Sequence, residues 1–418
     1  MKIALVCDRY PFRPHSGIGT FVQMLAHGLQ QRGHSVLVVE IGDCYREASD
    51  RGVPIFMLPR SRLPCLGNLI TRVRLRNWLA ARVRAGEIEL IEVPDYPGFL
   101  PFGIRGCVTV VRLHQSSTVS DRLAGLKRSP GIYLYEKRTL TVNRNWIAVS
   151  AHIVALTEQA FGISPKRLAT IPNGISSAAD DSGPAPDLPS RFVLYAGQVS
   201  RRKGSLVLAE AAREFLPRHP EVQLVYAGGC LPEPGVPPMD ETIRGIVGRE
   251  LAERVHFLGQ LAREQTLACM RRAAVFAFPA LIDCFPLVVL EAMKAGAPVV
   301  FTKNPPGPEM VEDGISGLLA DPDSPQDFAE KISWLLANPE FAARIAAKAQ
   351  ERVAERFSSE RCVRATEQFY EDCLREAHPL IQTLPAAPAT VVEFAPRTWI
   401  QPKLSTSSSP RLETKKPA

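Results

Sequence analysis

The stretch Pro279–Thr302, PALIDCFPLVVLEAMKAGAPVVFT, carries the pattern that decides the fold. It holds two acids, Asp283 and Glu291, with only uncharged residues between them. The preceding residues, AVFAF, are a short apolar run typical of a buried strand, so Asp283 falls in the loop at the carboxyl end of that strand. Pro286 suits a first helical turn and predicts a helix over about 286–295. The two acids therefore reach one edge of a sheet from a loop and from a helix, and do not share one helix face.

The same alternation of apolar strands and helical patterns runs through the chain in two series. Strands are expected at 2–7, 35–42, 53–58, 88–93, 107–113 and 146–150, and again at 191–197, 222–228, 254–259, 274–280 and 298–302. Helices are expected in the second series at 205–219, 239–253, 262–273 and 286–295. Alternation of this kind predicts parallel sheets with right-handed crossovers. The expected fold is α/β, with two Rossmann-like doubly wound domains facing each other across a cleft.

Composition changes predict the domain boundaries. We expect an N-terminal domain over 1–175, a Pro-, Ser- and Asp-rich linker over 176–190, and a C-terminal domain over 191–358. Residues 359–377 have the pattern of an amphipathic helix, which we expect to pack back on the N-terminal domain. Residues 378–418 are rich in Pro, Ser and Thr and are expected to be a disordered tail.

The overall composition narrows the class of protein. The chain has 418 residues, of which 45% are hydrophobic and 22% charged, as in globular proteins with a sizeable core. The net charge of +7 favours anionic partners without choosing among nucleotides, phosphates, anionic lipids and nucleic acids. Nine scattered cysteines without a CxxC pair are typical of reduced thiols in a cytoplasmic protein. No apolar run is long enough to span a membrane.

Ligands of open α/β sheets bind at the carboxyl ends of strands, near helix N-termini. Lys203 lies there, in VSRRKGS after the strand at 191–197, and we favour a phosphate contact for it. The neighbouring Arg201 and Arg202 fit a solvated charge run equally well. His114 ends the strand at 107–113 and is expected to face the cleft.

Three further elements have two readings each. The turn HSGIGT, with Gly17, Ile18 and Gly19, lacks the third glycine of GxGxxG, so a phosphate or sugar contact and a plain strand-to-helix turn are equally favoured. Asp283 could be only a helix cap. Glu309, in the Pro- and Gly-rich loop 302–309, could belong to plain loop chemistry.

Two other stretches resemble functional motifs. The acids of DPD at 321–323 match a metal-binding DxD pattern, but the helical SPQDFAEKISWLL follows directly and indicates a helix start. The Arg-rich stretch 60–84 lacks the interleaved aromatics of nucleic-acid sites, so we expect no nucleic-acid partner. It fits a basic helix at an anionic membrane surface, and an ordinary charged helix face equally well.

Together these motifs resemble glycosyltransferase family 4, whose members are retaining enzymes of GT-B fold. The resemblance covers about residues 1–375 and rests on VLYAGQVSRRKG, VSAHIVALTEQAFGISPKRLATIPNGI, PALIDCFPLVVLEAMKAGAPVVFT and VEDGISGLLADPDSP. It implies transfer of a sugar from a nucleotide-sugar donor, bound by the C-terminal domain, to a glycan or lipid-linked acceptor on the N-terminal side. It implies neither a metal nor another cofactor.

The resemblance also implies roles for individual residues. Glu291 would hold the ribose hydroxyls, Asp283 would lie beside the donor sugar, Lys203 would bind the diphosphate, and His114 would belong to the catalytic region. The implied catalytic set is thus His114, Asp283 and Lys203; the donor-binding set is Glu291, Arg202, Phe285, Leu287, Val288, Gly197 and Glu309; and the loop near the acceptor is Gly17, Ile18 and Gly19.

The chain departs from the family pattern at four places. Asp283 stands where the family has Glu, Pro286 where it often has Gly, and Gln198 where Arg is common, while PPGPE (305–309) replaces GGxPE. Pro286 removes one N–H donor from the loop.

The leading hypothesis is a transferase of bacterial cell-surface polysaccharide or glycolipid synthesis, cytoplasmic or peripheral at the inner face of the membrane. The departures at Gln198 and Asp283 leave open a weak or silent GT-B binding subunit, and within the same fold a nucleotide-sugar epimerase is a second alternative.

Overall fold

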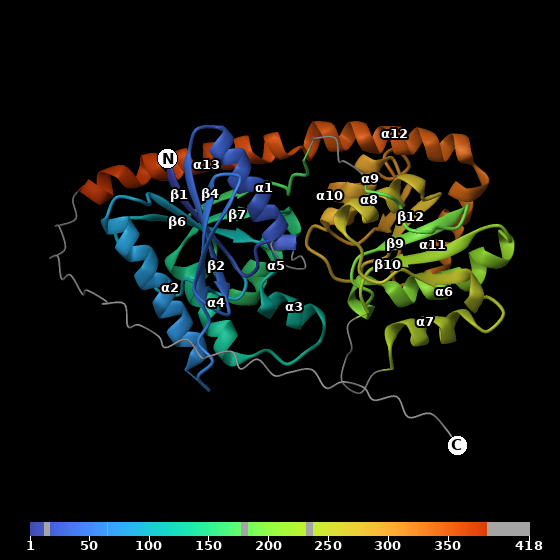
Figure 1. The fold of residues 1–418 in the computed structure, drawn as a ribbon, viewed down its shortest axis with the longest axis horizontal. Coiled ribbons are helices and arrows are strands. Elements are labelled where there is room, and N and C mark those ends of the chain that lie inside the picture. Colours follow the sequence, from blue (N-terminus) through green and yellow to red (C-terminus); the bar gives the residue numbers. More distant parts are fainter. Residues whose placement is uncertain (12–16, 65, 177–182, 231–236, 383–418) are drawn as a thin grey trace, which may run out of the picture. The chain divides into compact units, whose positions relative to one another are not determined.

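The computed structural model describes residues 1–11, 17–64, 66–176, 183–230 and 237–382, which form two α/β domains with one sheet each (Figure 1). The first sheet has the strand order β3-β4-β2-β1-β5-β6-β7-β8, and the second has β11-β10-β9-β12-β13-β14. All pairings are parallel except β3 with β4. The predicted architecture of two Rossmann-like domains is confirmed. The tail beyond Gln382 lies outside the described residues.

The elements of the first domain follow the predicted strand–helix rhythm. They are β1 (Lys2–Cys7), α1 (Gly17–Gln31), β2 (Ser35–Gly42), β3 (Arg46–Asp50), β4 (Val53–Pro59), α2 (Gly67–Arg84), β5 (Leu90–Pro94), β6 (Val108–Leu113), α3 (Ser117–Leu123), α4 (Pro130–Val142), β7 (Asn145–Ala148), α5 (Ala151–Phe161) and β8 (Arg167–Thr170).

The second domain repeats the rhythm with shorter strands. Its elements are β9 (Phe192–Ala196), α6 (Ser205–Arg218), β10 (Gln223–Ala227), α7 (Met239–Val247), β11 (Val255–Phe257), α8 (Arg263–Arg272), β12 (Val275–Phe278), α9 (Leu287–Ala295), β13 (Val299–Thr302), α10 (Gly307–Met310), β14 (Leu318–Ala320), α11 (Pro325–Ala337) and α12 (Pro339–Arg356). A last helix, α13 (Ser359–Gln382), ends the described chain.

The structure differs from the sequence-based expectation in three elements. The antiparallel strand β3 was not expected; it pairs with β4 through a tight turn in which Arg51 and Gly52 both have positive φ, as a two-residue hairpin turn requires. The helix expected over 239–253 ends at Val247, because Gly248 adopts φ 92°. Helix α13 continues to Gln382, five residues past the boundary expected from composition.

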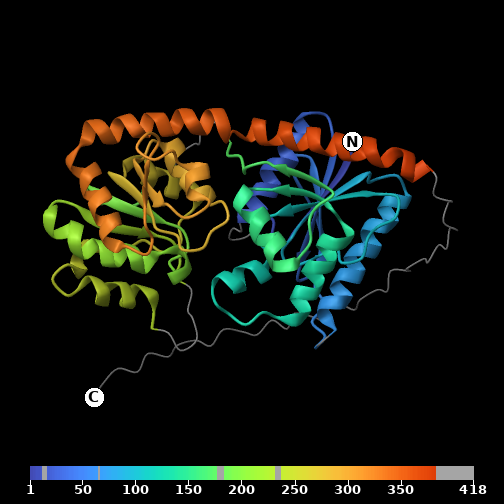
Figure 2. The same cartoon turned by 180° about the vertical axis from the view of Figure 1, so that it is seen from behind.

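Helix α13 packs on the first domain, whereas α12 belongs to the core of the second (Figures 1 and 2). Close contact with α1 depends on Gly28, where an added Cβ would come within 2.4 Å of Val363. Below α13, the Arg112 guanidinium donates to both oxygens of Glu92 at 2.8 and 2.9 Å, and Tyr370 Oη donates to Glu92 at 2.6 Å. The three residues come from β6, β5 and α13 and are buried, so their hydrogen bonds anchor the last helix to the first sheet.

None of the helices in the described part of the chain is both long and apolar enough to cross a bilayer.

Candidate functional site

The loop carrying Lys203 is locked against the loop carrying Asp283. Residues Arg201–Lys203 form a single 3₁₀ turn after β9, and Gly204 follows with φ 76°. A Cβ on Gly204 would lie 1.8 Å from the carbonyl oxygen of Pro279, so only glycine permits this approach. The two loops therefore meet at the carboxyl edge of the second sheet.

Backbone and side-chain contacts complete this junction. The carbonyl of Arg202 accepts from the N–H groups of Leu281 and Ile282 at 3.1 and 3.2 Å. The ammonium of Lys203 forms an ion pair with the carboxylate of Asp283. Their side chains are 20% and 10% exposed, so the pair is largely sheltered yet still open on one side.

Glu291 lies on α9 and lines a cavity of about 800 Å³. Its carboxylate accepts from the guanidinium of Arg263, with Nη2 at 2.9 Å from Oε1. Leu287 lines the same cavity, and residues of α1, including Phe21 and His27, form the opposite wall. The cavity thus has one wall from each domain and a carboxylate and a guanidinium on the second-domain side.

The first turn of α9 presents N–H groups at the same edge. Pro286 is the N-cap, so the helix begins at Leu287. The N–H of Val289 reaches back to the carbonyl of Pro286 at 3.2 Å, whereas first-turn donors such as those of Leu287 and Val288 have no acceptor within an α-helix. These two groups could bind an anion.

His114 is buried at the end of β6, and its ring contacts the ring of Phe21 with 5.1 Å between centroids. Burial, and next the charge of Arg112, lower the pKa of His114 to about 3, so its imidazole is neutral at neutral pH. Its backbone N–H donates to Asp95 at 2.9 Å, and the following residue, Gln115, has the unusual φ of 97°. A strained backbone at this point is a feature often associated with functional sites.

Asp95 holds the His114 loop in place. Its carboxyl group accepts three backbone N–H groups, from Tyr96, His114 and Gln115, at 2.9 to 3.2 Å. Complete burial nevertheless raises the pKa of Asp95 to about 7, with the N–H groups acting against that rise.

Four hydrogen bonds join the first domain to the loops of the second. The thiol of Cys284 donates to the carbonyl of His114 at 2.7 Å, and Ser150 Oγ donates to the carbonyl of Cys284 at 3.3 Å. The carboxylate of Glu309 accepts from the N–H groups of Ala151 and His152, the first residues of α5, at 3.0 and 3.3 Å. Cys284, the residue after Asp283, thereby links the Asp283 loop to His114.

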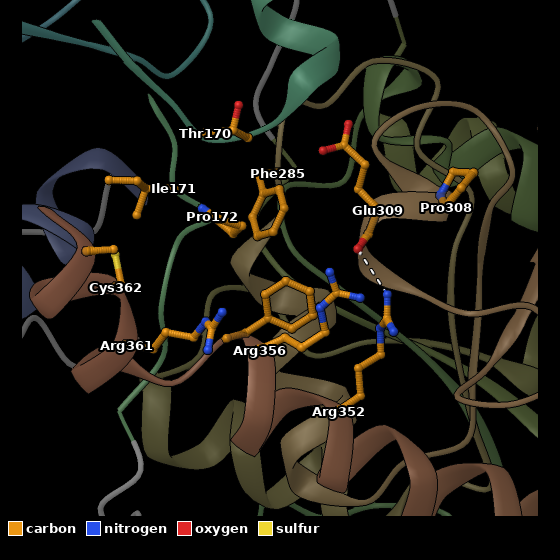
Figure 3. A pocket seen from close by; sticks show the side chains of 12 residues that line it. Thr170, Ile171, Pro172, Phe285, Pro308, Glu309, Arg352, Arg356, Arg361 and Cys362 are labelled. Atoms are coloured by element: carbon orange, nitrogen blue, oxygen red, sulfur yellow. Dashed lines mark hydrogen bonds between the residues drawn. The ribbon is translucent and has the colours of Figure 1, made fainter. Parts of the chain in front are cut away.

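The remaining predicted site residues lie at several places around this centre. Phe285 and Glu309 line a different cavity, of about 420 Å³, which shares no lining residue with the one at Glu291 (Figure 3). Gly197 has φ 128°, and its carbonyl oxygen is approached closely by the residue after β10, Gly228, where an added Cβ would lie 1.7 Å from that oxygen. The side chain of Arg202 is exposed.

Gly17, Ile18 and Gly19 form the first turn of α1. The rest of their predicted loop, residues 12–16, lies outside the described residues. The structure therefore describes only the helical half of the loop expected near the acceptor.

Sequence reasoning missed four residues of this region: Asp95, Ser150, Arg263 and Cys284. Asp95 directly follows β5, so its position at a strand's carboxyl end was a usable signal. Ser150 is the N-cap of α5 and accepts from the N–H of Ile153. Helix capping alone accounts for a serine at this position, so the sequence does not indicate its hydrogen bond to the carbonyl of Cys284. Nothing local to Cys284 or Arg263 indicates their partners.

The described residues contain no group of three or more His, Cys, Asp or Glu side chains placed to hold a metal ion. Asp321 of the DPD stretch pairs with Lys303 at 2.7 Å, and Ser324 caps α11 by accepting from the N–H of Asp327.

Comparison with known proteins gives one consistent family. Residues 15–178 match the family described as Glycosyltransferase Family 4, and residues 179–352 match Glycosyl transferases group 1. The phosphatidyl-myo-inositol mannosyltransferase of Mycolicibacterium smegmatis is 27% identical over 376 residues, covering 84% of this chain and 89% of the relative. A D-inositol 3-phosphate glycosyltransferase of Corynebacterium jeikeium is 36% identical over 137 residues, 32% of each chain.

Solved structures share the fold at lower identity. Sucrose-phosphate synthase from Thermosynechococcus elongatus aligns with a TM-score of 0.71 at 21% identity, covering 90% of this chain and 99% of that one. HepE of Anabaena, in complex with UDP and glucose, aligns with a TM-score of 0.67 at 20% identity, covering 89% and 100%. The two sheets, the paired loops at their edges and these matches agree: the chain is a glycosyltransferase of family 4 with the GT-B fold.

Proposed function

We propose that this glycosyltransferase moves a sugar from a nucleoside-diphosphate donor to a glycan or glycolipid acceptor, with retention at the anomeric carbon and without a metal. The observation that carries the proposal is the convergence of Lys203 and Asp283 at the edge of the second sheet, next to the first turn of α9. A cation and free N–H groups suit a diphosphate, and the carboxylate of Glu291, in a cavity whose lining includes Leu287 but neither Lys203 nor Asp283, suits paired hydroxyl groups.

The reaction then follows from where charge develops. As the bond between the anomeric carbon and the phosphate oxygen breaks, negative charge grows on the diphosphate, where Lys203 and the N–H groups of Leu287 and Val288 stabilise it. The acceptor hydroxyl attacks from the face that the diphosphate leaves, and its proton passes to the departing phosphate oxygen. His114 is neutral, so its role is to hydrogen-bond the sugar rather than to supply a positive charge.

The relatives support the choice of acceptor class. By its name, the mycobacterial relative transfers mannose to phosphatidyl-myo-inositol, and HepE was solved with UDP and glucose. For this chain we propose a nucleotide-sugar donor and a polyhydroxylated, lipid-linked or glycan acceptor used in cell-surface polysaccharide or glycolipid synthesis, in the cytoplasm or at the inner face of the membrane.

Not every arginine of 60–84 is available to a membrane surface. Arg72 is buried and donates to the carbonyls of Asn68, Pro97 and Gly98, and Arg82 stacks over Trp78 at 3.5 Å. The start of the stretch exposes Arg60, Arg62, Leu63 and Leu66, and farther along the helix Val73, Arg74 and Arg84 are exposed as well. We propose that the start of the stretch contacts anionic lipid; sedimentation with anionic vesicles tests it, and equal binding of Arg60→Gln/Arg62→Gln and the unaltered protein would contradict it.

Binding of UDP, GDP and ADP by calorimetry in EDTA, with NAD as a control, tests the central proposal. We expect one nucleoside diphosphate to bind, and Glu291→Ala to remove that binding. Glu330→Ala is the matched control, because Glu330 is an exposed helical glutamate of the same domain. Binding by none of the three nucleotides would favour the alternative of a silent subunit, which Gln198, Asp283 and Pro286 keep open.

A further inference from the structure

A second cavity, distinct from the one at Glu291, lies where α12 gives way to α13 (Figure 3). Its volume of about 420 Å³ is within the range of small-molecule sites. Its charged lining consists of three guanidinium groups, from Arg352, Arg356 and Arg361, and one carboxylate, from Glu309. Figure 3 shows the three arginines along one side of the pocket and the Glu309 carboxylate on the other.

Only one of the three guanidinium groups in this cavity has an ion-pair partner within the described part of the chain. Arg352 is engaged, since it donates to the carbonyls of Met310 and Glu309 and approaches Glu312 at 3.3 Å. Arg356 and Arg361 have no ion-pair partner among the described residues. Burial, and next the charge of Arg356, lower the pKa of Arg352.

The carboxylate of Glu309, which accepts from the N–H groups of Ala151 and His152, is the one negative charge on the lining. Three guanidinium groups against one carboxylate leave two positive charges on the lining. A phosphate monoester carries about −1.5 to −2 charges at neutral pH and matches the fork of a guanidinium group.

Apart from Thr170, the rest of the lining is mainly apolar and includes Pro172, Pro308, Phe285 and Phe357. The two phenylalanine rings meet edge to face at 5.8 Å, forming a wall against which a carbon skeleton can pack. From the charge and these walls, we propose that this cavity binds a small organic phosphate monoester through Arg356 and Arg361.

Such a ligand would also touch the loop that carries Asp283. Phe285 lies two residues after Asp283, and Cys284 between them bonds to His114 and Ser150 of the first domain. A ligand in the cavity therefore lies beside the loop that carries Asp283.

Calorimetry with glycerol 3-phosphate, with inorganic phosphate as the second probe and glycerol as the uncharged control, tests the site. We expect glycerol 3-phosphate to bind and glycerol not to. Glycerol 3-phosphate should bind more tightly than inorganic phosphate, because its carbon skeleton packs on the apolar wall. Tighter binding of inorganic phosphate would overturn the proposal that the ligand is organic. Each of Arg356→Gln and Arg361→Gln should weaken binding about tenfold, the effect of one charge-assisted hydrogen bond.

Arg364→Gln is the matched control, since Arg364 lies on α13 outside the cavity and pairs with Glu360. Lys203→Met should leave glycerol 3-phosphate binding in place, and a saturating nucleoside diphosphate should not displace the probe. If the nucleotide displaces glycerol 3-phosphate and Lys203→Met no longer binds it, the phosphate belongs to the donor site and the proposal is overturned. Absence of binding, or equal binding by Arg356→Gln, Arg361→Gln and the unaltered protein, would overturn it as well.

Nucleotide binding by the two arginine variants, measured in parallel, shows that they are folded. If the unaltered protein binds glycerol 3-phosphate but no nucleoside diphosphate, the proposed transferase function is contradicted and the proposal of this second site still stands.

Discussion

Replacing Asp283 by asparagine tests whether Lys203 serves a diphosphate. In the structure the Lys203 ammonium is paired with Asp283, so a diphosphate has to compete with that carboxylate for the same cation. The substitution keeps the side-chain oxygen that accepts from the N–H of Cys284 at 2.8 Å, and it removes only the charge. The loop is therefore expected to keep its shape while Lys203 loses its partner.

The size of the effect follows from the geometry of the pair. Two unit charges about 4 Å apart interact by about 4 kcal/mol at an effective dielectric constant of about 20. Both side chains are partly exposed, which screens the interaction and reduces the change to about 1.4 kcal/mol. We therefore expect Asp283→Asn to bind the nucleoside diphosphate about tenfold more tightly. Sugar transfer should nevertheless fall, because the proposed role of Asp283 is beside the donor sugar.

Calorimetric titration with the nucleotide at low and high salt measures both parts of this prediction. The gain in affinity should shrink at high salt, since screening weakens the charge competition. Asp313→Asn is the control, because Asp313 is an exposed loop carboxylate of the same domain that accepts from the N–H of Leu319 at 2.8 Å. Unchanged or weaker binding by Asp283→Asn would refute the competition between Asp283 and the diphosphate.

Three other substitutions probe the scaffold of the site. Gly204→Ala should lower the free energy of unfolding by about 1–2 kcal/mol from its positive φ alone. The clash with Pro279 should also weaken nucleotide binding. A nucleotide affinity equal to that of the unaltered protein in calorimetry would contradict the close packing of the two loops. Tyr370→Phe removes the 2.6 Å hydrogen bond to Glu92 and should cost about 1–3 kcal/mol in denaturant unfolding, so an unchanged midpoint would contradict the anchoring of α13. Burial raises the pKa of Asp95 to about 7 in the folded protein, against about 3.9 in an unfolded chain. The folded state therefore binds the extra proton, and unfolding free energy should fall from about pH 4 to about pH 7. This pH dependence should disappear in Asp95→Asn, because any hydrogen bond that the substitution weakens lowers the free energy of unfolding by the same amount at every pH. If the free energy of unfolding of Asp95→Asn changes with pH in parallel with that of the unaltered protein, the raised pKa of Asp95 is refuted.

Strand and helix positions in the second domain were predictable because each buried strand is a short apolar run followed by a glycine or a polar loop. The hairpin strand β3 was not, since its sequence, REASD, is charged and only its turn of Arg51 and Gly52 indicates pairing. The early end of α7 at Gly248 is a similar case, in which one positive φ outweighs the continuing helical pattern.

The candidate site divides in the same way. Lys203, Asp283 and Glu291 could be found because parallel strands bring their carboxyl ends to one edge, so residues that follow separate strands meet there. The contacts of Cys284 with Ser150 and with His114 join residues 134 and 170 positions apart, and no local pattern indicates them.

The sequence by itself therefore determined the two-domain α/β architecture, the family and the loops that carry the candidate donor residues, because these depend on local periodicity and on the order of strands. Only the tertiary structure decided that Phe285 and Glu309 line a cavity other than the one at Glu291, with Arg352, Arg356 and Arg361 beside them. Where a side chain points depends on packing between elements distant in the chain, and short-range sequence patterns do not record it.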